Sequence, residues 1–311
     1  MTRLAKPPPH LYFVGSAIFH YLGPSFAVLL FAVVPVAGVA WLRIVSAGLV
    51  FAIWRRPWRI LAHSDTATRW LIVGLGAVFA IMNYSFYLAI DALPLGTVAA
   101  IEFLGPLVLA LAGTRTMRNL AAVALAMSGV WVLTDVRLEG SPEGFAWAFA
   151  NALLFTAYIV LAHRLARAAA GTSPIDRLGA SMLVAAVVIT PLGLTSALPA
   201  FTDAGALAAG IGVGLSSSVI PYVFDQLAMQ RLPRETYSLF VALLPATAVV
   251  VGVIVLRQIP TVVEVAGVAL VILGVAIHRE RREAAPDPSG PDRGGEVLGE
   301  LGGVAGVEGT R

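Results

Sequence analysis

Three ionisable side chains lie inside long apolar runs of this 311-residue sequence: Arg43, Glu102 and Asp225. A charged group at the centre of a lipid bilayer costs about 2.5–3.5 kcal/mol, so such groups face a protein interior and mark candidate functional sites. Burial disfavours the charged form of a carboxylate, which suits reversible protonation. Glu102 is therefore a candidate to carry a proton, to hold a substrate ammonium, or to do both. The alternative is that it serves only as a structural partner of Arg43.

Other polar side chains stand at helical spacing inside the same runs. Tyr222 lies one turn before Asp225, and Asn83 lies one turn before Tyr87. Residues three or four apart share a face of a helix, so the members of each pair point the same way. Asp225 lies near the end of its run, where a carboxylate can also simply reach water. A functional and a solvated interpretation of Asp225 therefore both stay open.

The basic and imidazole groups in these runs also admit two interpretations. Arg43 shares a helix face with the small residues Ser46 and Ala47, which permit close approach of a second helix. We favour a role for Arg43 in holding helices together, with binding of a substrate carboxylate as the alternative. We expect His20 to be a satisfied interior donor rather than a proton relay.

The runs that hold these residues are predicted to be membrane-spanning helices. The chain is 58% hydrophobic and only 13% charged, whereas soluble domains carry about 25% charged residues. About 20 apolar residues in a helix cross the hydrocarbon core of a bilayer, where each segment must satisfy its own backbone groups. We therefore predict an all-α polytopic membrane protein with ten transmembrane helices. The predicted spans are 11–34, 35–54, 70–90, 94–112, 119–134, 144–163, 176–197, 204–229, 236–256 and 260–278.

Arginines are distributed over the loops in a way that supports this count. The loops after the second, fourth, sixth and eighth spans, and the end of the tenth, carry most of them: Arg55, Arg56, Arg59, Arg69, Arg115, Arg118, Arg164, Arg167, Arg177, Arg231, Arg234, Arg279, Arg281 and Arg282. Basic residues are retained on the cytoplasmic side of a membrane, so we expect both termini in the cytoplasm. Residues 280–311 are rich in Pro, Gly and acids and are predicted to be a disordered cytoplasmic tail.

The two halves of the chain share a weak internal repeat. At an offset of 139 residues, Leu88–Pro94 is similar to Leu227–Pro233, and later positions match at an offset of 145. The offset of 139 continues through Thr97 with Thr236, Leu104 with Leu243 and Pro106 with Pro245, and Gly129 matches Gly274 at the offset of 145. We predict two related five-helix repeats, 11–134 and 144–278. Five is odd, so the copies are inverted, as in many transporters with alternating access. The alternative is a chance alignment of Leu-rich helices.

The sequence context of several motifs excludes other protein classes. Gly74-Leu75-Gly76 lies inside an apolar run rather than at a strand–helix turn, so it is not a nucleotide loop. Ser216-Ser217-Ser218 would need a histidine base from a later span, and His278 lies only at the very end of the last one. The chain has no cysteine, which excludes thiolate metal sites. We expect no enzyme activity, no metal, no cofactor and no nucleic-acid partner.

Taken together, several stretches resemble the EamA type of the drug/metabolite transporter superfamily. The resemblance covers nearly all of residues 11–280, and the acidic, Pro- and Gly-rich tail departs from the pattern. The stretches are Trp41-Leu42-Arg43, Asn83-Tyr84, Phe86-Tyr87-Leu88, Pro94-Leu95-Gly96, Ile101-Glu102-Phe103-Leu104-Gly105-Pro106-Leu107, Pro221-Tyr222 with Asp225, and Arg231-Leu232-Pro233.

This resemblance implies an inverted-repeat fold around a central cavity, in the bacterial cytoplasmic (inner) membrane. It also implies proton-coupled export of amino acids such as threonine and homoserine, or of related small metabolites. Glu102, Asp225, Asn83, Tyr87 and Tyr222 would lie at or near the cavity. The implied partners are a small-molecule solute, protons and the lipid bilayer, and the oligomeric state stays open, a homodimer included.

Two alternatives to amino-acid export remain at this point. One is efflux or uptake of a different metabolite or of a cationic drug, although Arg43 in the cavity would disfavour a cation. The other is a membrane scaffold or sensor that transports nothing. That alternative predicts no flux of solute in liposomes, and the sequence offers no sizeable soluble domain through which it would signal.

Overall fold

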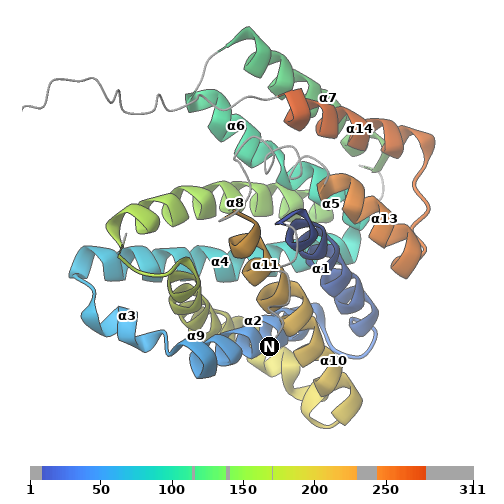
Figure 1. Cartoon of the computed structure of the whole chain (residues 1–311). Helices are drawn as coiled ribbons and strands as arrows, with labels where there is room; N and C mark the ends of the chain where they lie inside the picture. Colours follow the sequence, from blue (N-terminus) through green and yellow to red (C-terminus); the bar gives the residue numbers. More distant parts are fainter. Residues whose placement is uncertain (1–8, 114–115, 138–140, 170, 230–243, 278–311) are drawn as a thin grey trace, which may run out of the picture. The chain divides into compact units, whose positions relative to one another are not determined.

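The structure is a computed structural model that describes residues 9–113, 116–137, 141–169, 171–229 and 244–277. The chain divides into a compact unit, Met1–Arg279, and a C-terminal unit, Glu280–Arg311. The tail predicted to be disordered lies outside the described residues. Every regular element in the described part of the compact unit is a helix (Figure 1).

The helices follow one another along the chain. Their bounds are α1 Pro9–Leu30, α2 Val36–Arg55, α3 Trp58–His63, α4 Thr66–Ala92, α5 Leu95–Glu102, α6 Leu104–Gly113, α7 Met117–Arg137, α8 Pro142–Ala168, α9 Pro174–Phe201, α10 Ala204–Gly214, the π-helical turn η1 Leu215–Val219, α11 Ile220–Met229, α13 Leu244–Leu256 and α14 Val262–Ile277.

The helices agree with the predicted spans in number and order. Six helical segments of the described chain are long and apolar enough to cross a membrane, and four shorter apolar ones accompany them. The long segments are Leu11–Leu30, Val36–Arg55, Thr66–Ala92, Pro142–Ala168, Pro174–Phe201 and Ala204–Asp225. The shorter ones are Leu95–Leu109, Met117–Leu133, Leu244–Leu256 and Val262–Ile277. The prediction of an all-α polytopic membrane protein is confirmed.

Three local features differ from the predicted spans. The loop after the second span holds the short helix α3, and Asp65 then caps α4 by accepting a hydrogen bond from the Thr68 backbone N–H. Hydrogen bonds from the Thr68 hydroxyl and from nearby backbone N–H groups lower the pKa of Asp65. The fourth span is broken at Phe103 into α5 and α6. Pro106 has no N–H to donate to the Glu102 carbonyl one turn earlier, so the helix is interrupted there.

The third difference is the π-helical turn η1 within the eighth span. The Ile220 N–H donates to the Leu215 carbonyl, one residue further back than in an α-helix. Pro221 follows directly and cannot donate to the Ser217 carbonyl, which the α-helical pattern would require. The turn therefore leaves the Ser217 carbonyl available to a side chain.

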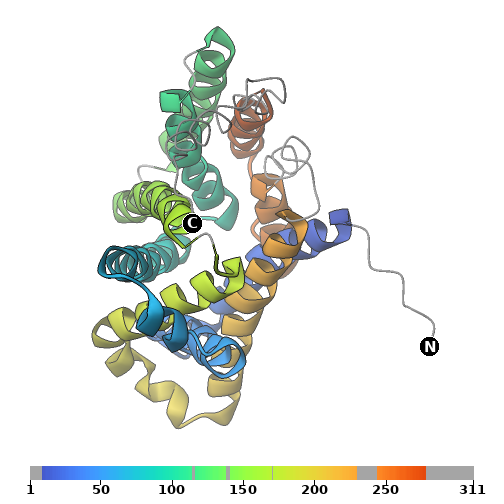
Figure 2. The same ribbon diagram turned by 60° about the vertical axis from the view of Figure 1, so that its left-hand side comes forward.

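The helices pair across the two predicted halves in a reciprocal pattern. The second span packs on the seventh (α2 on α9), the fifth on the tenth (α7 on α14), and the fourth on the ninth (α5 on α13). The third packs on the sixth (α4 on α8), and the first on the eighth (α1 on α11). Both views show α7 beside α14 (Figures 1 and 2). Exchanging the halves leaves this pattern unchanged, which supports an inverted repeat; the repeat itself stays a prediction.

Small residues carry the contact between α7 and α14. A Cβ atom at Gly129 would lie 2.5 Å from the Gly267 carbonyl oxygen, and one at Gly274 would lie 2.5 Å from the Ala122 carbonyl oxygen. The offset of 145 residues that separates Gly129 from Gly274 also separates Ala122 from Gly267. The two close contacts are therefore equivalent under exchange of the halves.

We expect Gly129→Ala to destabilise the protein by about 1–3 kcal/mol, because its Cβ would force the two backbones apart. Gly212→Ala is the matched control, since a Cβ there meets nothing within 4 Å and alanine favours the helix by about 0.5–1 kcal/mol. The measurement is thermal unfolding of both purified variants in detergent. An unchanged melting temperature for Gly129→Ala would show that α7 and α14 do not pack this closely.

Candidate functional site

Arg43 occupies an interior position in α2, with 4% of its surface exposed. Its Nε donates a hydrogen bond to Ser218 Oγ at 2.9 Å, and its Nη2 donates to the Ser217 carbonyl oxygen at 3.3 Å. The guanidinium also lies over the Tyr87 ring, 5.2 Å from the ring centroid. The two hydrogen-bond acceptors are neutral groups of η1, and one of them is the carbonyl that Pro221 leaves available. Arg43 therefore joins α2 to α4 and to η1, and it forms no direct ion pair with the described residues.

Glu102 is the last residue of α5, at the break before α6. Its Oε1 accepts a hydrogen bond of 3.2 Å from Nδ2 of Asn151, a fully buried residue of α8. Arg43 interacts electrostatically with Glu102, but the ion pairs found in the described part of the chain join other residues. Glu102 is thus near Arg43 without being locked to it.

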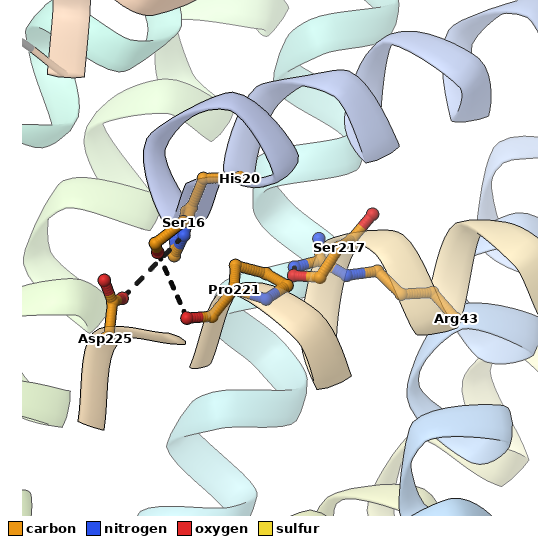
Figure 3. A network of polar contacts seen from close by, with 6 residues as sticks. All are labelled: Ser16, His20, Arg43, Ser217, Pro221 and Asp225. Carbon is orange, nitrogen blue, oxygen red and sulfur yellow. Dashed lines mark hydrogen bonds and ion pairs between the residues drawn. The ribbon is translucent and has the colours of Figure 1, made fainter. Parts of the chain in front are cut away.

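Asp225 of α11 belongs to a second polar cluster, formed with α1 (Figure 3). Its Oδ2 lies 4.0 Å from His20 Nδ1, and the Ser16 hydroxyl contacts its carboxylate. Ser16 also donates to the Pro221 carbonyl oxygen at 3.1 Å. The side chain of Asp225 is 18% exposed, so the interpretation of this carboxylate as simply solvated does not describe its surroundings. His20 pairs with an acid, which the sequence did not predict.

Tyr222 lies between the two clusters. Its ring contacts His20 at 5.5 Å and Phe79 at 5.7 Å between centroids. It interacts electrostatically with Arg43, Glu102 and Asp225. One interior region therefore holds all three intramembrane charges that the sequence singled out.

Asn83 differs from the other predicted site residues. Its buried Nδ2 donates to the Phe79 carbonyl oxygen one turn earlier in α4, at 2.7 Å. In the described residues it forms no hydrogen bond with the other predicted site residues. Such local bonding is a common use of asparagine inside a helix, and the structure gives Asn83 no place in the charged clusters.

Some residues of these clusters were missed by the sequence reasoning. Asn151 and Ser16 are polar residues within apolar runs, and that placement was the available signal. Ser217 and Ser218 stood out only as part of a protease-like pattern. Their actual partner is Arg43, which lies 174 and 175 residues away in the sequence. The described residues contain no group of three or more His, Cys, Asp or Glu able to hold a metal ion.

A separate cavity of about 300 Å³ lies at the end of the bundle predicted to be extracytoplasmic. Asp91, Thr97, Gln258 and Glu264 contribute polar groups to its lining. The Leu95 backbone N–H at the start of α5 donates to Gln258 Oε1 at 3.1 Å, which ties α5 to the segment between α13 and α14. The cavity lining does not include the two charged clusters.

Comparison with known proteins identifies the family. The model of the EamA-like transporter family matches residues 142–278. The threonine/homoserine exporter RhtA of Salmonella typhimurium (strain SL1344) is 31% identical over 253 residues, which are 80% of this chain and 84% of the relative. RhtA of Escherichia coli (strain K12) is 30% identical over the same shares. The chain belongs to the EamA-like transporter family.

A solved crystal structure shares the fold of this EamA-like chain. It matches with a TM-score of 0.53 and 21% identity, over 86% of this chain and 95% of the other. The family match and the two relatives confirm the resemblance identified from the sequence, and the chain is a multi-pass membrane transporter. The range matched by the family model nearly coincides with the predicted second half, 144–278.

We expect Ser218→Ala to lower stability by about 1–3 kcal/mol, because it leaves a buried, charged Nε–H without an acceptor. Ser216→Ala is the matched control, since among the described residues the Ser216 hydroxyl bonds the Gly212 and Val213 carbonyls one turn earlier in the same span. Thermal unfolding of the two variants in detergent makes the comparison. Equal melting temperatures would mean that Ser218 does not support Arg43.

Proposed function

We propose that this EamA-like protein exports small amino acids, such as threonine and homoserine, across the bacterial cytoplasmic membrane in exchange for protons. The names of the relatives support the substrate class. The observation that carries the proposal is the environment of Glu102, an interior acid that accepts a hydrogen bond from one neutral amide and forms no direct ion pair within the described part of the chain. Such a group is able to exchange a proton for a substrate ammonium.

The transport cycle follows from this exchange. Glu102 is protonated while the protein faces outward. After the protein changes to its inward-facing conformation, Glu102 releases its proton to the cytoplasm, and its carboxylate then binds the ammonium of an amino acid. The outward movement of the bound solute returns Glu102 to the outside, where protonation displaces the solute. Asp225, paired with His20, is a second acidic site along the same route, and Tyr222 joins the two.

Proton movement is a sufficient driving force. Inward transfer of one charge gains about 2.3 kcal/mol per 100 mV of membrane potential. At about 1.4 kcal/mol per factor of ten, this supports a solute gradient of nearly two orders of magnitude per proton.

The reciprocal helix pairs support alternating access. Two conformations with opposite openings arise when inverted halves exchange shapes, and the pairing of α1 with α11 and of α4 with α8 is the pairing that such an exchange preserves. With both termini in the cytoplasm, the turn between α4 and α5 lies outside. Asn83, within this scheme, supports α4 beside Tyr87.

We expect Glu102→Gln to abolish threonine uptake into inside-out vesicles driven by an acidic lumen, because glutamine neither releases a proton nor neutralises an ammonium. Glu143→Gln is the control, since Glu143 lies in the first turn of α8, on the predicted outer side. The measurement is uptake of labelled threonine with and without a protonophore. Retained, pH-dependent uptake by Glu102→Gln would exclude the proposed cycle.

A further inference from the structure

Three buried polar atoms around Arg43 lack a direct hydrogen bond in the described part of the chain: Arg43 Nη1, the Tyr87 hydroxyl and the Ser217 hydroxyl. They come from α2, α4 and η1. The Tyr87 hydroxyl lies close to both Ser217 and Arg43, and Figure 3 shows Ser217 beside the Arg43 side chain. One guanidinium nitrogen and two hydroxyl groups are therefore gathered around Arg43.

The charge balance around these atoms is incomplete. The direct partners of Arg43 are a hydroxyl and a carbonyl, both neutral. Glu102, His20 and Tyr222 are titratable groups that interact with it electrostatically at longer range. A buried cation is normally paired with an anion and fully hydrogen bonded, and a guanidinium matches the geometry of a carboxylate in particular. A carboxylate placed here would engage Nη1 and both hydroxyls.

We propose that Arg43, Tyr87 and Ser217 bind the carboxylate of the transported solute, while Glu102 and Asn151 hold its ammonium. This inference rests on the proposed export of amino acids and narrows it. The solute must carry a free carboxylate next to an ammonium, so that its two charges offset those of Arg43 and Glu102. Neutral derivatives and simple amines lack the group that Arg43 requires.

The local backbone holds Ser217 in this position. The π-helical turn and Pro221 direct its carbonyl to Arg43, so the residue is anchored through its backbone. Its hydroxyl lies near Tyr87 and forms no direct hydrogen bond within the described part of the chain. Gly23 of α1 lies against the same turn, and a Cβ there would come within 2.8 Å of the Ser217 backbone nitrogen. The turn η1 and its contacts with α1 and α2 therefore fix the position of Ser217. A fixed position is what the recognition of a small, rigid group requires.

The test is competition for uptake of labelled threonine into inside-out vesicles that contain the full chain. The competitors are unlabelled threonine, threonine amide and 1-amino-2-propanol, of which the last two lack the carboxylate. The amide and the amine cannot form the charge-assisted hydrogen bonds that a carboxylate forms with Arg43. We therefore expect them to compete about tenfold to a hundredfold more weakly than threonine.

The variants Tyr87→Phe and Ser217→Ala separate recognition from folding. We expect each to reduce the preference for threonine over threonine amide by about threefold to tenfold, without changing competition by the amide. Tyr84→Phe and Ser216→Ala are matched controls on the same two elements and should keep the wild-type preference. Equal competition by threonine and its amide in the wild type would overturn the carboxylate site while leaving amino-acid export intact.

Absence of threonine uptake would overturn the proposed function instead. The carboxylate site is then tested by comparing the melting temperature of the purified chain in sodium acetate with that in sodium chloride at equal ionic strength. Stabilisation by acetate that Tyr87→Phe and Ser217→Ala both remove would support the site. Equal melting temperatures of the wild type in the two salts would overturn it.

Discussion

The cost of a buried charge governs the interior of this protein. Arg43 lies in the middle of an apolar helix, where an unpaired cation is strongly disfavoured. Its neighbours reduce the free-energy cost of burying this cation, because Ser218 and the Ser217 carbonyl accept its hydrogen bonds and the Tyr87 ring lies against the guanidinium. In the proposed site, the carboxylate of the transported solute offsets the remaining charge of Arg43. A transporter that offsets this charge with its own solute links binding directly to the electrostatics of the bilayer interior.

Prolines create the irregular backbone that this interior needs. Pro106 interrupts the fourth span just after Glu102, and Pro221 follows the π-helical turn whose carbonyl holds Arg43. Backbone groups freed within a membrane persist only where protein or solute satisfies them. Both irregularities lie beside charged residues, on elements from opposite halves of the chain. The contact between α7 and α14, by contrast, is formed by small residues such as Gly129 and Gly274.

Hydropathy and length were sufficient to predict the helical class and the order of the ten spans. The cost of buried charge was sufficient to predict that Arg43, Glu102 and Asp225 share an interior. The partners of these groups were not predictable, because Asn151 and Ser217 meet them only through packing between distant helices. Asn83 was predicted at the site from its type and its spacing from Tyr87, whereas its hydrogen bond in the structure is a local one to the Phe79 carbonyl within α4. The short helix α3 was missed because its six residues are too few for a periodic pattern.

Exchange of protons for solute is the central claim, and it is tested most directly by following both in one experiment. Proteoliposomes with the purified chain are loaded with threonine and a pH-sensitive dye, then diluted into threonine-free buffer of the same pH. The account predicts that threonine leaves while the lumen acidifies, and that liposomes without the protein show neither change. Threonine efflux through the protein with a constant lumenal pH would contradict proton exchange.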